Sequence, residues 1–361
     1  MNACENLRNL LLKRPFERAG FHDHVWPDTL RRWIDEGYPC HEGQPEDPSQ
    51  RFGFDIVMFG GIDPMPMRGS DEVLEETETW VVRRNGAGAV QRTWKHRSGA
   101  PEHLAFGMTS RDVWDREYRH LLVDPDPARI AFDSISDAFK KARRQGLFVC
   151  AHNSFLWENM RSMLGDVCML EGMALDPAWI KDYNRTYTDF YKTHYRLIFK
   201  EIGLPDGTSI SEDLAYNKGL LCSPALLEEL YLPYWRELTD FFHSHNLPVT
   251  IHSDGDISAA LDIFVEAGFD AINPLEAKAG CDALRIAEQH HDRLTFKGAL
   301  DARVLESGDR DLIRREVTRL IDGMKRLGAG YIFGSDHSVS ARVAYQDYAH
   351  AVEVFKEHRC Y

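Results

Sequence analysis

The chain has 361 residues, 43% of them hydrophobic, and its 57 acidic residues outnumber 43 basic ones to give a formal charge of −14. This composition is typical of a folded globular protein with a sizeable core, and the excess of acid disfavours binding to nucleic acid or to an anionic membrane surface. The seven cysteines form no Cys-x-x-Cys motif and are odd in number, which fits reduced thiols better than a disulfide framework.

The early part of the chain contains many turn signals and few regular patterns. Its first residues hold only a short apolar stretch broken by charge, so we expect neither a secretory signal nor a transmembrane helix, and a cytoplasmic location. Residues 27–37 predict a short helix that begins with a proline and stops at a glycine. Residues 79–96 hold two strand-like runs around an Asn-Gly dipeptide, which predicts a β-hairpin with a type I′ turn. We expect residues 1–130 to be an N-terminal extension packed on the barrel and residues 131–361 to form the main part of the barrel, in a single domain overall.

From about residue 145, apolar runs alternate with long amphipathic segments. The apolar runs predict strands in GLFVCAH, TSISEDL, PVTIHS, AINPL, LTFKGAL and GYIFGSD. Helices are predicted between or after them, near residues 176–203, from 223 onward, and near 257–267, 281–291, 309–327 and 345–358. Asp176-Pro177 and Ser223-Pro224 are expected helix starts, and Gly268 and Gly328 lie where C-terminal caps belong.

This alternation of strands and helices is typical of a parallel sheet with helical crossovers. A phosphate-binding Gly-x-Gly-x-x-Gly loop would favour an open doubly wound sheet, but the sequence holds neither that motif nor a Walker-type loop. Polar residues instead follow nearly every late strand, where a barrel enzyme carries its reactive groups. The predicted fold class is therefore α/β, a (β/α)₈ TIM barrel with an N-terminal extension that contains a β-hairpin.

Several late motifs resemble, in order, those of the uroporphyrinogen decarboxylase superfamily. They are SEDLAYNKGLLCSPALLEELYLPYWREL, IHSDGDI, INPLEAKAG, FKGALDARVL and GYIFGSDHSVS. The resemblance implies a TIM barrel and one of two chemistries: metal-free decarboxylation of uroporphyrinogen, or zinc-dependent methyl transfer to or from a corrinoid. True decarboxylases carry an N-terminal Arg-Gln-Ala-Gly-Arg-like segment that grips the tetrapyrrole carboxylates. The nearest segment here, FERAG at residues 16–20, lacks the second arginine, so the chain is closer to the methyltransferase-like branch.

The corrinoid methyltransferases of this superfamily bind zinc through a His-x-Cys after one strand and a Cys after a late strand. At the matching places this chain has His252-Ser253-Asp254 and His337, and Glu276 follows the next strand. The resemblance therefore implies a site for zinc, or another divalent metal, formed by His252, Asp254, Glu276 and His337. Without thiolates, the metal would be a harder Lewis acid, which suits an oxygen substrate such as a methoxy group.

The other polar residues at the strand ends are predicted to serve the reaction or the substrate. We predict catalytic roles for His337, Asp213 and Asp336, and substrate contacts for His152, Glu212, Asn273 and Asp301. Structural alternatives stay open for several of them. His152 could be structural, Glu212 and Asp213 could cap the following turn, Asp301 could fix a loop, and Glu158 could be a surface acid at a helix start.

Together these features predict a metal-dependent methyltransferase that acts on a small methylated substrate, with an O-methyl group favoured. The chain has no Asp-x-His-x-x-Gly corrinoid-binding signature, so the corrinoid that accepts the methyl group would come on a separate partner protein. Two alternatives stay open. One is decarboxylation of a small or tetrapyrrole-like carboxylic acid, with Asp213 and His337 as catalytic groups. The other is a non-catalytic barrel that only binds a ligand.

Overall fold

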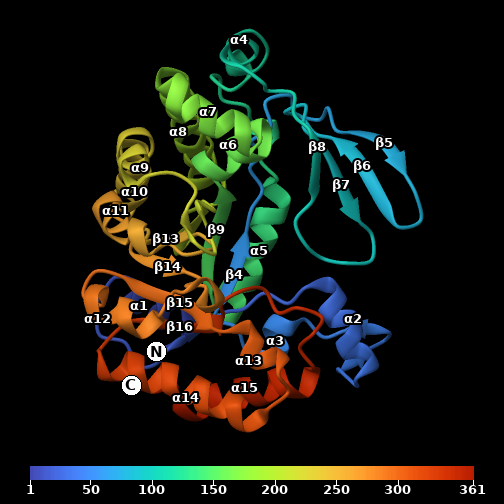
Figure 1. Ribbon diagram of the computed structural model, residues 1–361. Helices are drawn as coiled ribbons and strands as arrows, with labels where there is room; N and C mark the ends of the chain where they lie inside the picture. Colours follow the sequence, from blue (N-terminus) through green and yellow to red (C-terminus); the bar gives the residue numbers. More distant parts are fainter.

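Eight parallel strands form a nearly closed barrel in this computed structural model, which describes residues 1–361 (Figure 1). The strands are β1 (Gly20–Phe21), β4 (Ile56–Phe59), β9 (Phe148–Ser154), β10 (Gly207–Ser211), β13 (Val249–His252), β14 (Ala271–Asn273), β15 (Thr295–Leu300) and β16 (Tyr331–Ser335). From β4 to β16 each strand pairs with the next one in the chain, and β1 pairs with β16, so that β1 and β4 are the two edges of the sheet. The predicted (β/α)₈ barrel and its six late strands are confirmed.

Hydrogen bonds through Asp55 bridge the gap between the two edge strands. The Asp55 backbone N donates to the Phe21 carbonyl at 2.8 Å, and the Phe21 N donates to Asp55 Oδ2 at 2.9 Å. Arg18 donates to both carboxylate oxygens of Asp55 at 2.7 Å, and both side chains are largely buried. Because Arg18 and Asp55 precede their strands, this pair lies at the amino end of the barrel. The arginine of the FERAG segment thus closes the barrel and does not reach the carboxyl ends of the strands.

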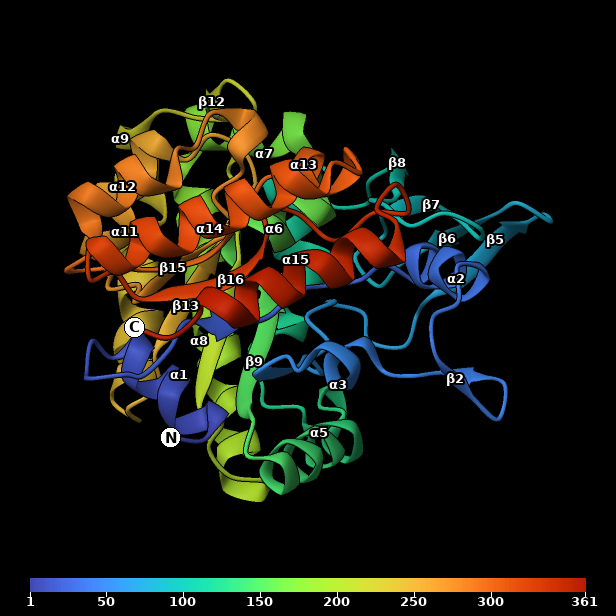
Figure 2. The same cartoon turned by 90° about the horizontal axis from the view of Figure 1, so that it is seen from below.

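Helices cover the outside of the barrel (Figures 1 and 2). They are α1 (Ala3–Leu11), α2 (Pro27–Asp35), α3 (Pro48–Phe52), α4 (Arg111–Val113), α5 (Phe132–Gln145), α6 (Leu156–Leu164), α7 (Asp166–Leu175), α8 (Pro177–Glu201), α9 (Pro224–Leu230), α10 (Leu232–His243), α11 (Leu261–Ala267), α12 (Ala283–His290), α13 (Ala302–Glu306), α14 (Arg310–Arg326) and α15 (Tyr345–His358). The expected helix starts are confirmed, since the side chains of Asp176 and Ser223 accept hydrogen bonds from the first turns of α8 and α9. Gly268 and Gly328 have φ values of +88° and +65° just after their helices.

Residues 1–130 contribute more to the barrel than the sequence suggested. They supply β1 and β4, while the other six barrel strands lie in residues 131–361, the expected main part of the barrel. Strands β1 and β4 have only two and four residues, too few for an apolar pattern to stand out among turn signals.

The N-terminal region also forms a four-stranded antiparallel sheet of β5 (Glu72–Glu76), β6 (Trp80–Arg84), β7 (Val90–Trp94) and β8 (Glu102–Ala105), which stands beside the barrel in Figure 1. Two small hairpins are β2 (Cys40–His41) with β3 (Gln44–Pro45) and β11 (Ala215–Tyr216) with β12 (Gly219–Leu220).

The predicted hairpin exists as β6 and β7, with Trp80 opposite Trp94. Its turn differs from the two-residue type I′ turn that the Asn-Gly dipeptide indicated. The connection runs over five residues, 85–89, and is closed by a hydrogen bond of 2.9 Å from the Asn85 N to the Ala89 carbonyl. The residue with positive φ is Gly88, at +76°, because the longer loop needs its left-handed residue near the end.

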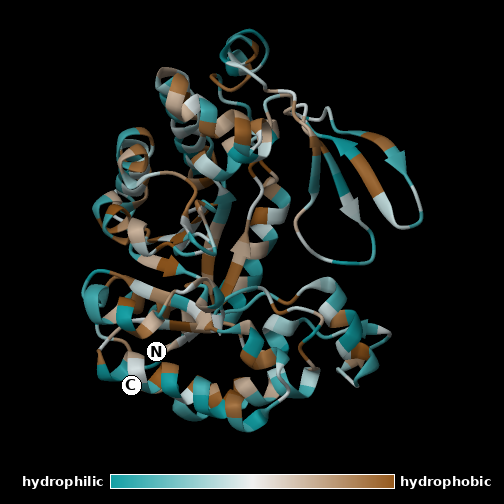
Figure 3. Cartoon of the chain, in the orientation of Figure 1, coloured by the Kyte–Doolittle hydropathy of each residue, from teal (hydrophilic) through white to brown (hydrophobic).

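The hydrophobic core is continuous between the barrel strands and the surrounding helices. In Figure 3 the central strands carry brown, hydrophobic stretches, whereas the helices alternate brown with teal. Helix α8 places Tyr183, Tyr187, Tyr191 and Tyr195, four residues apart, on one fully buried face. This pattern is typical of helices that pack one face against a sheet. None of the helices combines the length and the apolar character needed to cross a bilayer.

Candidate active site

A cavity of about 470 Å³ lies at the carboxyl ends of the barrel strands. Residues in or just after all eight strands line it, and the wall includes five histidines, two aspartates and one lysine but only two hydrophobic residues. Such a volume is typical of sites for small molecules. The polar wall suits a charged or metal-bound ligand more than an apolar one.

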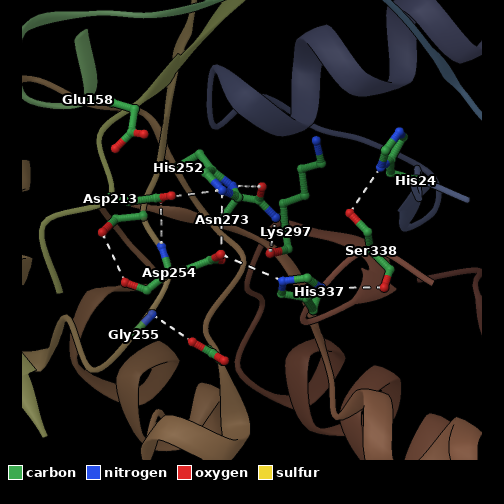
Figure 4. Close-up of polar contacts among 12 residues, drawn as sticks. His24, Glu158, Asp213, His252, Asp254, Gly255, Asn273, Lys297, His337 and Ser338 are labelled. Carbon is green, nitrogen blue, oxygen red and sulfur yellow. Dashed lines mark hydrogen bonds and ion pairs between the residues drawn. The ribbon is translucent and has the colours of Figure 1, made fainter. Parts of the chain in front are cut away.

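Three polar side chains at this end of the barrel, two of them in the cavity wall, form a group that could hold a metal ion (Figure 4). One ligand atom each from Asp213, His252 and Asp254 lies within 4.8 Å of the others. The His252 Nε2 atom is 3.7 Å from the Asp213 Oδ1 atom and 3.7 Å from the Asp254 Oδ1 atom. The His337 Nε2 atom lies 3.9 Å from the Asp254 Oδ2 atom. Imidazole nitrogen and carboxylate oxygen are common ligands of divalent metals, and a cation would also relieve the repulsion between the two aspartates.

The orientation of His252 is fixed by Asn273, its register partner on the neighbouring strand. The His252 Nδ1 atom is 2.7 Å from the Asn273 Oδ1 atom. The Asn273 Nδ2 group donates to the Lys297 carbonyl at 3.2 Å, which determines which end of the amide faces the histidine. Nδ1 of His252 therefore carries the proton, and Nε2 presents its lone pair to the aspartates. This tautomer and this partner are those that a metal-binding histidine needs.

A tight loop after β13 directs Asp254 into the cavity. Gly255 has φ +89°, and a Cβ atom there would lie 2.5 Å from the Ala215 carbonyl carbon. The Asp254 N donates to Asp213 Oδ1 at 3.2 Å, which brings the two aspartates together. Burial and repulsion from Asp213 raise the pKa of Asp254, while His252 acts in the opposite direction. Only glycine satisfies both the backbone angle and the close approach at this position.

Glu276, expected as a metal ligand, already uses both carboxylate oxygens. Its Oε2 atom accepts a hydrogen bond of 2.7 Å from the Gly255 N, and its Oε1 atom is 2.8 Å from the Lys278 Nζ atom. Glu276 therefore holds the loop that carries the ligands, and it does not belong to the metal-ligating group. Asp213, expected as a catalytic residue, belongs to the metal-ligating group where Glu276 was expected.

Asp336 and Asp301, expected in catalysis and substrate binding, serve loops outside the cavity. The Asp336 carboxylate is buried and accepts hydrogen bonds from the Ala277 N at 2.9 Å and the Ala302 N at 2.8 Å. It thereby ties together the segments after β14 and β15, and burial raises its pKa. Asp301 accepts from the Arg303 N at 2.9 Å and forms an ion pair with the same residue. Neither aspartate lines the cavity, and backbone donors nearby already engage their oxygens, so the catalytic role of Asp336 and the substrate contact of Asp301 stay predictions that this geometry does not support.

Glu212, expected to contact substrate, is fully buried and supports the start of α6. It accepts hydrogen bonds from the Leu156 N and the Glu158 N, both at 3.0 Å, and from the Trp235 Nε1 at 2.8 Å. Burial raises the pKa of Glu212 to about 8, although these three donors favour the carboxylate. The expected substrate contact stays a prediction, and the hydrogen bonds show that Glu212 caps the start of α6 and not the turn that follows Glu212.

Glu158, regarded as a surface acid, lines a second cavity together with Asp213. The second cavity, of about 810 Å³, is lined by α6, α7 and the region around β8, and it contains both Glu158 and Asp213. The Glu158 Oε2 atom is buried without a hydrogen-bond partner. Burial, and secondarily repulsion from Asp213, raise the pKa of Glu158 to about 7. This acid can therefore exchange a proton near neutral pH beside the metal-ligating group.

Sequence reasoning missed the residues that line the other side of the cavity. His22, Asp23 and His24 follow the two-residue strand β1, and Lys297 lies in the middle of β15. A signal for Lys297 was present, because a lysine within the apolar run LTFKGAL is rarely buried without a reason. His152, expected to contact substrate, does line this side, and burial lowers its pKa to about 4. Its role stays a prediction.

The chain is similar to one family model and to several solved structures. Residues 212–358 match the family model described as uroporphyrinogen decarboxylase (URO-D). A methyltransferase from Methanosarcina mazei superposes with a TM-score of 0.71 over 99% of both chains, at 13% sequence identity. An endo-β-1,4-xylanase from Gloeophyllum trabeum gives a TM-score of 0.42 at 9% identity, over 64% of this chain and 83% of that chain. A B12-independent methionine synthase from Shewanella sp. W3-18-1 also gives 0.42 at 9% identity, over 91% and 85%. A search of curated protein sequences finds no match.

Proposed function

Because residues 212–358 match the uroporphyrinogen decarboxylase family model, we propose that this chain is a member of that superfamily and a metal-dependent methyltransferase for a small methylated substrate. The observation that carries the proposal is the position of the His252 Nε2 atom, 3.7 Å from the nearest oxygen of each of Asp213 and Asp254. The likeness in fold to the Methanosarcina mazei methyltransferase, over nearly the whole of both chains, supports the same branch of the superfamily.

In this proposal Asp213, His252 and Asp254 hold the metal, with His337 within reach as a further ligand. When bound, zinc or another divalent cation supplies a Lewis acid that stabilises negative charge on the heteroatom from which the methyl group leaves. Asn273 keeps His252 in the tautomer that can bind a cation. Glu158, with its pKa raised to about 7, is placed beside Asp213 to give a proton to the leaving heteroatom.

The methyl group passes, in this proposal, to a reduced corrinoid carried by a separate protein. The bond between the methyl carbon and the substrate heteroatom breaks, and the heteroatom keeps the electron pair. The methyl carbon forms its new bond with the electron pair that the reduced corrinoid supplies. The cavity at the carboxyl ends of the strands supports this arrangement, because substrate bound there lies where barrel enzymes carry out their chemistry.

Decarboxylation of a small carboxylic acid is the second candidate, and Lys297 in the cavity wall is the observation that favours it. Decarboxylation of a tetrapyrrole lacks such support. The superfamily's decarboxylases grip the tetrapyrrole with N-terminal arginines, whereas Arg18 of this chain is bound to Asp55 at the amino end of the barrel. Four acidic side chains of a tetrapyrrole would require several fixed cations, and the cavity wall contains one lysine and no arginine.

The first experiment measures metal content by mass spectrometry after purification without chelators or a metal-affinity tag. We expect one divalent cation per chain in the wild type and in His41→Ala, which changes an exposed histidine. The cation should be lost from His252→Ala and Asp213→Asn. Equal metal content in all four proteins would contradict the metal site.

The second experiment tests methyl transfer with free reduced cobalamin as acceptor and methanol, methoxyacetate and dimethylglycine as methyl donors. Methylcobalamin formation is followed by its absorbance. We expect formation with at least one donor in the wild type and none in His252→Ala. Release of carbon dioxide from a carboxylic acid without any corrinoid would favour the second candidate.

A further inference from the structure

We propose that Lys297 is the anchor for an anionic group of the substrate, so that the substrate of this cavity is a small methylated carboxylate. The methylated part of this inference rests on the proposed function, whereas the anion site rests on the structure of the cavity alone. One carboxylate would neutralise the single ammonium group in the wall, and a small carboxylate fits a cavity of about 470 Å³.

The first support is the environment of Lys297 itself. Its side chain lines the cavity although the residue is only 8% exposed, and its neighbour Phe296 belongs to the hydrophobic core. In Figure 4 the Lys297 ammonium group extends into the site without any hydrogen bond or ion pair. Burying an ammonium group without a counter-charge is costly, and burial indeed lowers the pKa of Lys297. An anionic ligand would supply the missing partner.

The second support is that no acid of the protein neutralises Lys297 by contact. Asp23, an acid of the wall, favours the charged form of Lys297 through space, but its carboxylate oxygens are already engaged in hydrogen bonds. It accepts hydrogen bonds from the Ser335 N at 3.1 Å, the Ser335 Oγ at 2.8 Å and the Tyr348 hydroxyl at 3.2 Å. Burial raises the pKa of Asp23 to about 6. The other nearby ionisable group is the Cys150 thiol, whose pKa burial raises to about 12, so that it stays neutral.

The third support comes from the histidines beside Lys297. Burial, and then repulsion from Lys297, lower the pKa of His22. Burial is also the main cause that lowers the pKa values of His24 and His152, and the positive charge of Lys297 contributes to both. All three are therefore neutral near pH 7 and can act as hydrogen-bond donors without adding charge. The His152 Nδ1 atom is buried without a partner, so this side of the cavity has an unused polar atom as well as an unused cation.

The two sides of the cavity set the direction in which a substrate binds. The side with Lys297 offers a positive charge to a carboxylate, whereas the acid on the other side, Asp254, is in the proposed function taken up by a metal ion. Asn273 lies between them, since it contacts the His252 ring through Oδ1 and the Lys297 carbonyl through Nδ2. A small molecule with its carboxylate at Lys297 would therefore place its opposite, methylated end near the metal-ligating group.

The test compares binding of methoxyacetate with that of methoxyacetamide, its uncharged analogue, by ligand-observed NMR on the purified protein. We expect the wild type to bind methoxyacetate about tenfold more tightly or better, the usual effect of a hydrogen bond to a charged group. Lys297→Met should lose this preference. Lys13→Met is the matched control, because Lys13 contacts the opposite end of the same strand at Leu294 and Thr295, and it should keep the preference.

A second measurement needs no variant of Lys297. In the wild type, methoxyacetate should protect the Lys297 amine from reductive methylation by formaldehyde, as read by peptide mass spectrometry, and methoxyacetamide should not. Equal binding of both compounds to the wild type, or an unchanged preference in folded Lys297→Met, would overturn the proposal. His252→Ala should keep the preference for the carboxylate. Failure of metal binding or methyl transfer would therefore contradict the proposed function and leave the anion site standing.

Discussion

Replacing Asn273 by leucine removes the acceptor that holds the His252 ring in its metal-binding tautomer. In the wild type the His252 Nδ1 atom lies 2.7 Å from the Asn273 Oδ1 atom, and no other side chain accepts from this nitrogen. In Asn273→Leu the ring can rotate, and its proton can move to the Nε2 atom that should bind the cation. The side chain volume is nearly conserved, so the loss should fall mainly on metal binding.

The expected magnitude follows from this single contact. Loss of a hydrogen bond that orients a metal ligand typically weakens metal affinity about 10- to 100-fold, which is about 1.4–2.7 kcal/mol. Zinc affinity can be measured at pH 7.5 by competition with a fluorescent chelator. Asn273→Asp keeps an acceptor oxygen at the same place and should retain most of the affinity.

Asn153→Leu is the matched control for the loss of an asparagine at a strand end. Asn153 lies at the end of β9 and donates to the Tyr195 hydroxyl at 2.5 Å, away from His252. It should bind zinc as the wild type does. Zinc affinity of folded Asn273→Leu equal to that of the wild type would refute the reasoning that Asn273 orients a metal ligand.

Three further changes test other parts of the structure. Because burial raises the pKa of Glu158 from 4.5 to about 7, the folded state holds this proton more tightly, and the free energy of unfolding should fall as pH rises between these values. Glu158→Gln should remove about 2 kcal/mol of that fall, as measured by urea unfolding at pH 5 and pH 8. Gly255→Ala should cost about 2 kcal/mol in urea unfolding and weaken zinc binding, because its Cβ would clash with Ala215; wild-type values would contradict the strain. Arg18→Met leaves the Asp55 carboxylate buried without its partner and should cost about 3 kcal/mol. The same variant and the wild type should both form no coproporphyrinogen from uroporphyrinogen, and formation by the wild type would restore a tetrapyrrole role for the N-terminal segment.

The sequence by itself determined the order of the late strands and helices and the end of the barrel at which polar groups gather. Strands such as VTIHS and GYIFGSD are apolar until their last residues, and helix starts such as Ser223-Pro224 carry their caps in the adjacent sequence. These are local signals, since backbone hydrogen bonding and burial of one strand or helix depend mostly on neighbouring residues. These local signals were sufficient to predict that His252, Asp254 and His337 lie in one cavity.

Only the tertiary structure decided which strand-end carboxylates are free to bind a ligand. Glu276 and Asp213 look alike in sequence, yet Glu276 is engaged by Gly255 and Lys278 whereas Asp213 faces His252. Lys297, the lysine of the cavity wall, likewise has no ion-pair partner because none of the surrounding strands places an acid in contact with its ammonium group. A carboxylate or ammonium group is available for chemistry when its hydrogen-bonding capacity is not already used, and the partners that use it come from segments distant in the chain. The spacing of residues along one strand cannot contain that information.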